Sequence, residues 1–344
     1  MITGKGGVVA DDMRPLVAVV LGDPSGIGPE IVAKSLALPE TRRWCRPVVI
    51  GDARVAEGGI AIAKVPLVVS RCRAVEDFRD LEGTLEILDL ANAAPGSFPA
   101  KEVSLAAGRA TLETLERAIR LAQAGDVSAV TFAPLNKQAL HLAGNPFGDE
   151  LQLIAHWLGV TGCGEINVVD ELWTSRVTSH IGLREVSQRL TREGVLAAIR
   201  LMHTTLSRAG IPDARIGVAA LNPHGGEGGL FGPEEEAVIA PAVKDAQAEG
   251  IRARGPFPAD TIFVRTRRGE FDGVVTMYHD QGQIALKLLG FERAVTVQGG
   301  LPIPVTTPSH GTAFDIVGKG SADVGAFQAA LRMAVRMVRG TRQV

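Results

Sequence analysis

The stretch that decides the fold is DGVVTMYHDQGQIALKLL, residues 272–289. Its first part, 272–276, is short, apolar and rich in β-branched residues, which predicts a buried strand. From residue 283 the apolar spacing predicts a helix, so His279 and Asp280 lie between a predicted strand and a predicted helix. In open α/β sheets, ligands bind beyond the carboxyl ends of the strands. The stretch therefore predicts an α/β fold with a site at His279.

Two further histidines have the same placement. His180 follows the strand-like run 176–179, and His224 follows 217–223, in a chain that contains only 7 histidines. Imidazole is a common ligand of Zn²⁺ and related divalent ions. Each histidine alone is equally well explained as a hydrogen-bonded residue at a strand end. The three together favour one shared metal site.

The composition sets the broad class. The chain has 344 residues, of which 46% are hydrophobic and 22% charged, which is typical of a globular protein with a large core. A formal net charge of -2 and the lack of a long basic run give no reason to expect nucleic acid. No apolar run approaches membrane-spanning length. Cys45, Cys72 and Cys163 have neither zinc spacing nor a paired framework, which indicates a reducing cytoplasm.

Strand-like and helix-like segments alternate along the chain, as in α/β layers. Residues 1–12 lack the apolar core of a signal peptide, and we expect a flexible tail there. Residues 166–169 and 175–179 are a candidate hairpin. Predicted strands are 16–21, 47–50, 65–69 and 129–134, and predicted helices are 107–124, 151–158, 186–209 and 234–249.

Glycine-rich loops separate several of these elements. The loop 22–30 stands between a strand and a helix, where helix amides can bind an anion, although a tight turn explains it equally well. Its spacing is not that of a dinucleotide-binding G-x-G-x-x-G loop. The loop 222–234 has five glycines, which allow close approach of backbone to a ligand. We expect a rigid loop at 255–261 and a nucleotide loop at 309–320.

These motifs resemble the 4-hydroxythreonine-4-phosphate dehydrogenase family of pyridoxal phosphate synthesis, of which this chain would be a divergent member. The resemblance implies two α/β/α domains with a cleft, like those of isocitrate and isopropylmalate dehydrogenases. We expect a first domain from residues 13–140 plus about 300–344, and a second, with metal and dimer contacts, from about 141–299. The matching motifs are GDPSGIGPE at 22–30, SHIGLRE at 179–185, LNPHGGEGGLFG at 221–232, GPFPAD at 255–260, MYHDQG at 277–282 and HGTAFDIVGKGSADVG at 310–325.

The resemblance also implies the chemistry. It predicts a cytoplasmic homodimer that uses NAD and a divalent metal (Zn, Mg, Co or Mn) to oxidise a secondary alcohol, with decarboxylation an open second step. His180, His224 and His279 would bind the metal, with ligands shared across the dimer. Lys287 and Asp280 would be catalytic, and Asn222 would contact substrate. The loop at 309–320 resembles the adenosine loop of isopropylmalate dehydrogenases. This resemblance implies cofactor contacts at His310, Gly311, Thr312 and Asp315.

The expected substrate pocket departs from the family pattern. Asp149 and Glu150 stand where the family has His and Thr, Thr296 replaces an Asn, and Val305 replaces an Arg. Carboxylates repel a phosphate, so this pattern predicts poor use of a phosphorylated substrate. An alternative is a dehydrogenase of a non-phosphorylated hydroxy acid or cis-dihydrodiol. A second alternative is a metal-dependent hydrolase, against which the adenosine-like loop argues.

Overall fold

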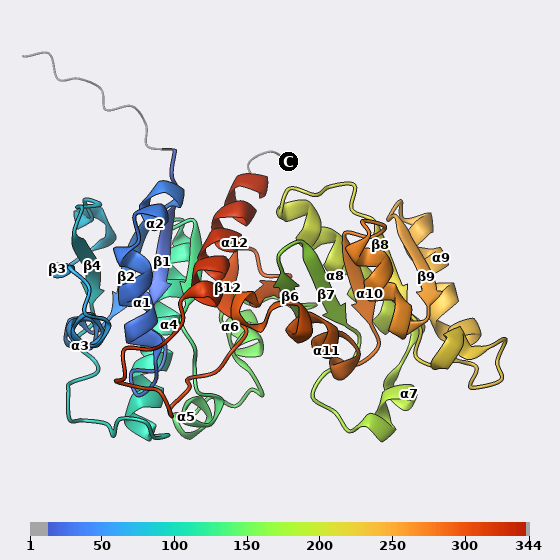
Figure 1. Ribbon diagram of the computed structural model, residues 1–344, viewed down its shortest axis with the longest axis horizontal. Helices are drawn as coiled ribbons and strands as arrows, with labels where there is room; N and C mark the ends of the chain where they lie inside the picture. Colours follow the sequence, from blue (N-terminus) through green and yellow to red (C-terminus); the bar gives the residue numbers. More distant parts are fainter. Residues whose placement is uncertain (1–12, 342–344) are drawn as a thin grey trace, which may run out of the picture.

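The computed structural model describes residues 13–341, so the tail expected at 1–12 lies outside the described residues. One mixed sheet of 12 strands runs through this part of the chain (Figure 1), in the order β3-β4-β2-β1-β5-β12-β11-β6-β7-β10-β8-β9. The strands are β1 Leu16–Val20, β2 Arg46–Gly51, β3 Val68–Cys72, β4 Thr84–Asp89, β5 Ala129–Phe132, β6 Gly164–Val169, β7 Leu172–Arg176, β8 Ile216–Ala219, β9 Ala253–Phe257, β10 Gly273–Thr276, β11 Val295–Gly299 and β12 Val305–Pro308.

Helices cover the sheet, which confirms the expected α/β class. The α-helices are α1 Gly28–Ala37, α2 Pro39–Trp44, α3 Ala53–Ala63, α4 Leu105–Ala124, α5 Lys137–Leu142, α6 Glu150–Leu158, α7 Val186–Arg189, α8 Arg192–Arg208, α9 Ala240–Ala248, α10 Ala259–Arg267, α11 His279–Gly290 and α12 Gly325–Thr341. Short 3₁₀ segments are η1 Val75–Asp77, η2 Leu183–Glu185, η3 Pro223–Gly226 and η5 Phe291–Arg293, and a π-helical turn, η4, spans Glu235–Ile239.

The alternation of side chains along β1 explains why helices lie on both faces of the sheet. Val17 and Val19 belong to one buried cluster, with residues of α1 and α12, whereas Ala18 and Val20 belong to another, with residues of α4. A strand that is apolar at every position must be covered on both sides. The long helix α4 begins where the Ser104 hydroxyl accepts a hydrogen bond from the Ala107 amide.

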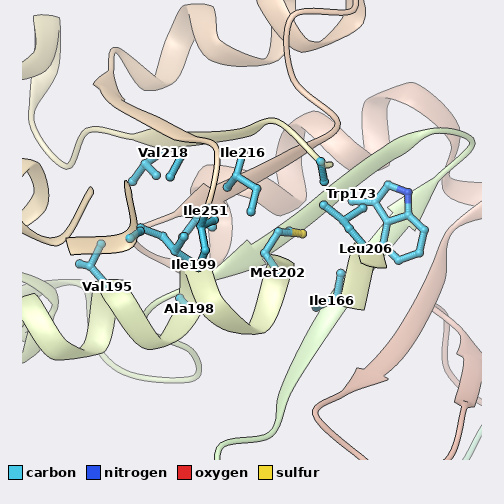
Figure 2. Close-up of a cluster of buried hydrophobic side chains, with 14 of the residues drawn as sticks. Ile166, Trp173, Val195, Ala198, Ile199, Met202, Leu206, Ile216, Val218 and Ile251 are labelled. Carbon is cyan, nitrogen blue, oxygen red and sulfur yellow. The ribbon is translucent and has the colours of Figure 1, made fainter. Parts of the chain in front are cut away.

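A third cluster fills the other half of the sheet, around α8 and strands β6 to β10. Figure 2 shows it, with Val195, Ile199 and Met202 of α8 against Ile216 and Val218 of β8. One half of the sheet consists of β1 to β5 and β12, and the other of β6 to β11. This grouping follows the segments expected for two domains, whose boundaries stay a prediction.

Several local expectations can be compared with the structure. β6 and β7 pair antiparallel, which confirms the hairpin. The strand expected at 65–69 lies three residues later, at Val68–Cys72, because this register pairs with β4. The rigid loop expected at 255–261 is wrong, because Gly255 to Phe257 continue β9, which pairs with β8, and α10 begins at Ala259. The helix expected at 186–209 is interrupted, since the Thr191 hydroxyl caps a new helix by accepting from the Gly194 amide.

Candidate active site

Each of the three candidate metal histidines follows a strand in the same half of the sheet. His180 lies after β7, His279 after β10 and His224 after β8, and these strands are parallel neighbours in the order β7-β10-β8. Parallel strands bring their carboxyl ends to one edge of a sheet, so the three connections start from a common edge. The placement expected from the sequence is therefore present in the fold.

His180 and His279 come together at this edge. Their imidazole ring centroids are 5.8 Å apart. The backbone of His180 has φ 53°, a left-handed conformation that is uncommon for a residue with a side chain and that often occurs at functional sites. Partial burial of the His180 ring lowers its pKa, and the positive charge of Lys137 lowers it further. A lowered pKa favours the neutral imidazole, which is the form that binds metal.

Asp280 orients the second ring of this pair. Its Oδ1 is 2.7 Å from Nδ1 of His279, so Nδ1 donates to the carboxylate and Nε2 would be the atom that could coordinate an ion. The two side chains are 38% and 72% exposed, so both face solvent rather than the core. A carboxylate behind a histidine is the usual support for a metal ligand. The pair thus offers the type of donor that divalent ions bind.

His224 does not join the other two within one chain. It is exposed in η3, with φ 54°, and its ring centroid lies 6.4 Å from that of Phe231. Among residues 13–341, no three His, Cys, Asp or Glu side chains are grouped closely enough to hold a metal ion. The expectation of three converging histidines is therefore not met inside a single chain. That His224 comes from a second copy, as the resemblance implies, stays a prediction.

A buried polar network lies beside His180 and was missed from the sequence. Arg176, at the end of β7, donates to Ser179 Oγ at 2.8 Å and to Asn167 Oδ1 at 2.7 Å, and it forms an ion pair with Glu165. Its side chain is only 7% exposed. The sequence signal for this network was Arg176 itself, a charged residue at the end of an otherwise apolar strand. The pairing of β6 with β7, which brings Asn167 and Glu165 to Arg176, could not be read from that signal.

Thr296, an expected substrate contact, belongs to the same network. Its hydroxyl accepts from the Asn167 amide at 3.0 Å and lies 2.7 Å from Ser309 Oγ. A cavity of about 500 Å³ adjoins the network and is lined by Asp149 and Arg176, among others. Arg176, Glu165 and Ser179 of the network line this cavity, and Ser179 directly precedes His180 in the chain.

Asp149 and Glu150, the other expected substrate contacts, differ in their surroundings. Asp149 caps α6, since its Oδ1 accepts from the Gln152 amide at 2.9 Å. Glu150 is buried, and its Oε2 has no hydrogen-bond partner among the described residues. Burial raises the pKa of Glu150, while the nearby charge of Lys137 opposes that shift. Lys137 thus lies close enough to influence both Glu150 and His180.

Two further positions named from the family pattern, Val305 and Asn222, have different surroundings. Val305 has no exposed surface and lies in the core cluster with Val130 and Leu301, so it is not a substrate contact. The Asn222 side-chain amide donates to Glu234 at 2.8 Å and to Glu235 at 2.9 Å, which ties the glycine-rich loop to the π-helical turn. Its role toward substrate stays a prediction.

Lys287, an expected catalytic residue, lies on α11, eight residues after His279, and is exposed. Eight residues of α-helix rise by about 12 Å, so Lys287 is not beside the histidine pair of its own chain.

The expected cofactor loop lies against the first glycine-rich loop. The Ile27 amide donates to the Thr312 carbonyl at 3.1 Å, and a Cβ on Gly26 would lie 2.9 Å from Cβ of Thr312. Thr312 is buried in this contact, whereas His310 is half-buried and Asp315 and Gly311 are exposed. The side chains available for a ligand are therefore His310 and Asp315, and Thr312 holds the two loops together.

Known proteins resemble the chain over almost its whole length. The family model of the pyridoxal phosphate biosynthetic protein PdxA matches residues 43–334. A Pseudomonas aeruginosa relative with the provisional name 4-hydroxythreonine-4-phosphate dehydrogenase 2 is 50% identical, over 94% of this chain and 97% of its own. D-threonate 4-phosphate dehydrogenase of Cupriavidus necator is 42% identical, over 95% of this chain and 98% of its own.

Solved structures agree with this picture. A 4-hydroxythreonine-4-phosphate dehydrogenase from Burkholderia phymatum is 41% identical, with a TM-score of 0.83 over 95% of this chain and 99% of its own. A terephthalate 1,2-cis-dihydrodiol dehydrogenase from Burkholderia xenovorans is 30% identical, with a TM-score of 0.65 over 94% of this chain and 98% of its own. The fold, the strand-end histidines and these relatives define the chain as a dehydrogenase. It belongs to the PdxA family, as the sequence motifs indicated.

Proposed function

We propose that the chain is an NAD- and divalent-metal-dependent dehydrogenase that oxidises the secondary hydroxyl of a small phosphorylated hydroxy acid. The observation that carries this proposal is the pair His180 and His279, with Asp280 behind it and the charge of Lys137 beside it. Imidazoles bind the ion, and a lysine attracts a phosphate. Relatives at 42% identity or more carry names of dehydrogenases that act on phosphorylated threonine-like acids, which supports the substrate class.

Each residue then has a defined task. His180 and His279 would hold the ion, and Asp280 fixes the ring of His279. When bound, the ion would polarise the substrate hydroxyl and NAD would accept the hydride. The buried guanidinium of Arg176, which is bonded to Asn167 and Ser179, would hold the chain that leads from β7 to His180. His310 and Asp315 would contact the adenosine half of NAD. In the proposed dimer, Lys287 of one chain would transfer a proton at the active site of the other chain.

A homodimer completes the site in this proposal. Ile284, Leu288 and Phe291 on one side of α11 and η5 are 61%, 83% and 50% exposed. The loop that carries His224 presents Leu230 and Phe231, which are 73% and 49% exposed. Two apolar surfaces near the histidine pair and near His224 are suited to bury each other between two copies. Such a contact would bring His224 of one copy to His180 and His279 of the other.

A second candidate is oxidation of a non-phosphorylated hydroxy acid or cis-dihydrodiol. Glu150, a buried carboxyl with an unpartnered oxygen close to the site, favours this candidate, as does the dihydrodiol dehydrogenase relative. A hydrolase would need water activation instead of a cofactor.

A substrate panel read at the NADH absorbance separates these functions. We expect metal-dependent NADH formation with D-threonate 4-phosphate or 4-hydroxythreonine 4-phosphate, and less with the dephosphorylated acids. NADH formation only with unphosphorylated substrates would support the second candidate. Hydrolytic turnover without NADH formation would contradict both.

Among residues 13–341, the structure contains no helix that combines the length and the apolar character needed to cross a membrane. A cytoplasmic location stays part of the proposal, and the three unpaired cysteines support it.

A further inference from the structure

A second cavity, of about 800 Å³, lies away from the histidine pair. Four of its lining residues are arginines, Arg293, Arg332, Arg336 and Arg339, against the two carboxylates of Asp170 and Glu171. The proposed reaction uses none of these residues. The excess of guanidinium groups over carboxylates gives the cavity a positive character.

The place of this cavity in the sheet separates it from the proposed active site. Glu171 directly precedes β7, and Gly210 lies shortly before β8, whereas His180 and His224 follow the other ends of these two strands. At about 3.3 Å per residue, the five residues of β7 separate the two ends by roughly 15 Å. Figure 1 shows α12, which carries three of the arginines, in the middle of the molecule between the two halves of the sheet. A ligand in the cavity would contact both halves.

The arginines of α12 form one row. Residues 332, 336 and 339 are four and three positions apart, so their side chains lie on one face of the helix, where like charges repel. Arg336 is paired with Glu171 at 3.1 Å. Arg332 and Arg339 have no carboxylate partner among residues 13–341. The attraction of cations to a helix C-terminus accounts for Arg339, in the last turn, but not for Arg332, two turns earlier.

Two tryptophans hold the row in place. The guanidinium of Arg332 lies over the Trp44 ring at 5.2 Å, and that of Arg336 lies 5.8 Å from the Trp173 ring. Contact with an aromatic ring restrains a guanidinium group and can leave N–H groups available for other partners. Trp173 is fully buried, and its indole N–H has no acceptor among the described residues. Figure 2 shows this nitrogen on the side away from Met202 and Leu206.

We propose that this cavity is an anion-binding site, separate from the active site, for a small organic dianion. Planar guanidinium groups bind carboxylate and phosphate oxygens with paired hydrogen bonds. Neither Arg332 nor Arg339 is paired with a carboxylate of the described residues, and Arg339 donates to the Trp44 carbonyl at a long 3.5 Å, so these two guanidinium groups are the candidates for such bonds. A dicarboxylate and a phosphate monoester offer the same double negative charge. Because the lining residues come from both halves of the sheet, a bound dianion would link Trp44 of α2 to the turn between β6 and β7.

Calorimetry on the full-length protein, without NAD or substrate, tests this proposal with two probes, succinate and inorganic phosphate. We expect saturable binding of at least one of them. In the double variant Arg332→Ala/Arg339→Ala the dissociation constant should rise at least about tenfold, since each lost charged hydrogen bond corresponds to about a tenfold change. Arg117→Ala removes an exposed arginine of α4 and should leave binding unchanged.

A variant that is expected to bind the probe more tightly excludes misfolding as the cause of weaker binding in the double variant. Glu171→Gln removes the acid that competes for Arg336, so it should tighten binding of the same probe several-fold. Saturation by succinate alone assigns the dicarboxylates, and saturation by phosphate alone assigns the phosphate esters. Binding in the double variant that equals wild type, or no saturable binding of either probe to the wild-type protein, would overturn the proposal. Raised temperature of unfolding with the bound probe, present in wild type and absent in the double variant, would support it.

Discussion

The imidazole rings of His180 and His279 lie 5.8 Å apart, although 99 positions of chain separate the two residues (279 − 180). They meet because β7 and β10 are parallel neighbours in register, with Arg176 opposite Thr276. Two imidazoles leave a divalent ion with too few protein ligands, since tetrahedral catalytic zinc sites use three. This incomplete set is the reason for expecting His224 from a second copy.

Mixing of inactive variants tests that expectation. His224→Ala and His279→Ala should each be inactive alone. Mixed in equal amounts after dissociation and reassociation, half of the dimers carry one intact site of two, so activity should return to about a quarter of wild type. His180→Ala mixed with His279→Ala is the matched control and should stay inactive, because both residues serve the same site. Recovery in the control, or none in the first mixture, would contradict the shared site.

Asp280→Asn should weaken the metal without removing a ligand. The carboxylate fixes His279 through Nδ1 at 2.7 Å, and losing such support typically costs about 10- to 100-fold in metal affinity or activity. Metal content after dialysis against graded chelator measures the effect, with His156→Ala as a control away from the pair. Raising the metal concentration should rescue much of the activity of Asp280→Asn. A loss that excess metal does not rescue would place Asp280 in the chemistry itself.

The sequence could reveal that these histidines lie at strand ends, because each follows an apolar, β-branched run that is typical of a buried strand. It could not reveal which histidines meet. That depends on a strand order, β7-β10-β8, that does not follow the chain. The same limit applies to Thr296, whose partners Asn167 and Ser309 are set by strand pairing. Val305 shows a different kind of error. Comparison with the family motif placed this residue in the substrate pocket, whereas the structure buries it in the sheet.

Gly26→Ala should disturb the expected cofactor loop through its contact with Thr312. The new Cβ would lie 2.9 Å from Cβ of Thr312, so the loops must separate, at a cost of about 1–3 kcal/mol in stability. We expect a raised apparent NAD constant with unchanged metal affinity, and the same kinetic signature for Asp315→Ala. Gly144→Ala, where nothing lies within 4 Å of the new Cβ but φ is 101°, controls for glycine replacement. Unchanged NAD affinity in both loop variants would move the cofactor elsewhere.

Glu150→Gln should change how stability depends on pH. Burial raises the folded-state pKa of Glu150 above its unfolded value, so the folded protein holds the proton over the window between the two. Stability linked to this group is therefore lost as pH rises through that window. Glutamine does not titrate, so the stability of the variant relative to wild type should increase from acidic to neutral pH. Denaturant unfolding at several pH values measures this. A relative loss at neutral pH would show that attraction to Lys137 outweighs burial.

We expect Lys137 to distinguish a phosphorylated from an unphosphorylated substrate. Its charge reaches both His180 and Glu150, and Asp149 is engaged in capping α6, so the carboxylates beside the site are less free to repel a phosphate than their sequence positions indicate. Losing one charged hydrogen bond costs roughly 1.5–3 kcal/mol, so Lys137→Ala should lower kcat/KM for D-threonate 4-phosphate about 10- to 100-fold.

The loss should be selective for the phosphate. With D-threonate as substrate, Lys137→Ala should change kcat/KM little, and Lys137→Arg should keep most of the activity toward the phosphorylated acid because it keeps the charge. An equal loss for both substrates would assign Lys137 to the reaction rather than to the phosphate. Wild-type preference for D-threonate or a cis-dihydrodiol would instead support the non-phosphorylated alternative, in which the unpartnered oxygen of Glu150 receives a neutral hydroxyl of the substrate.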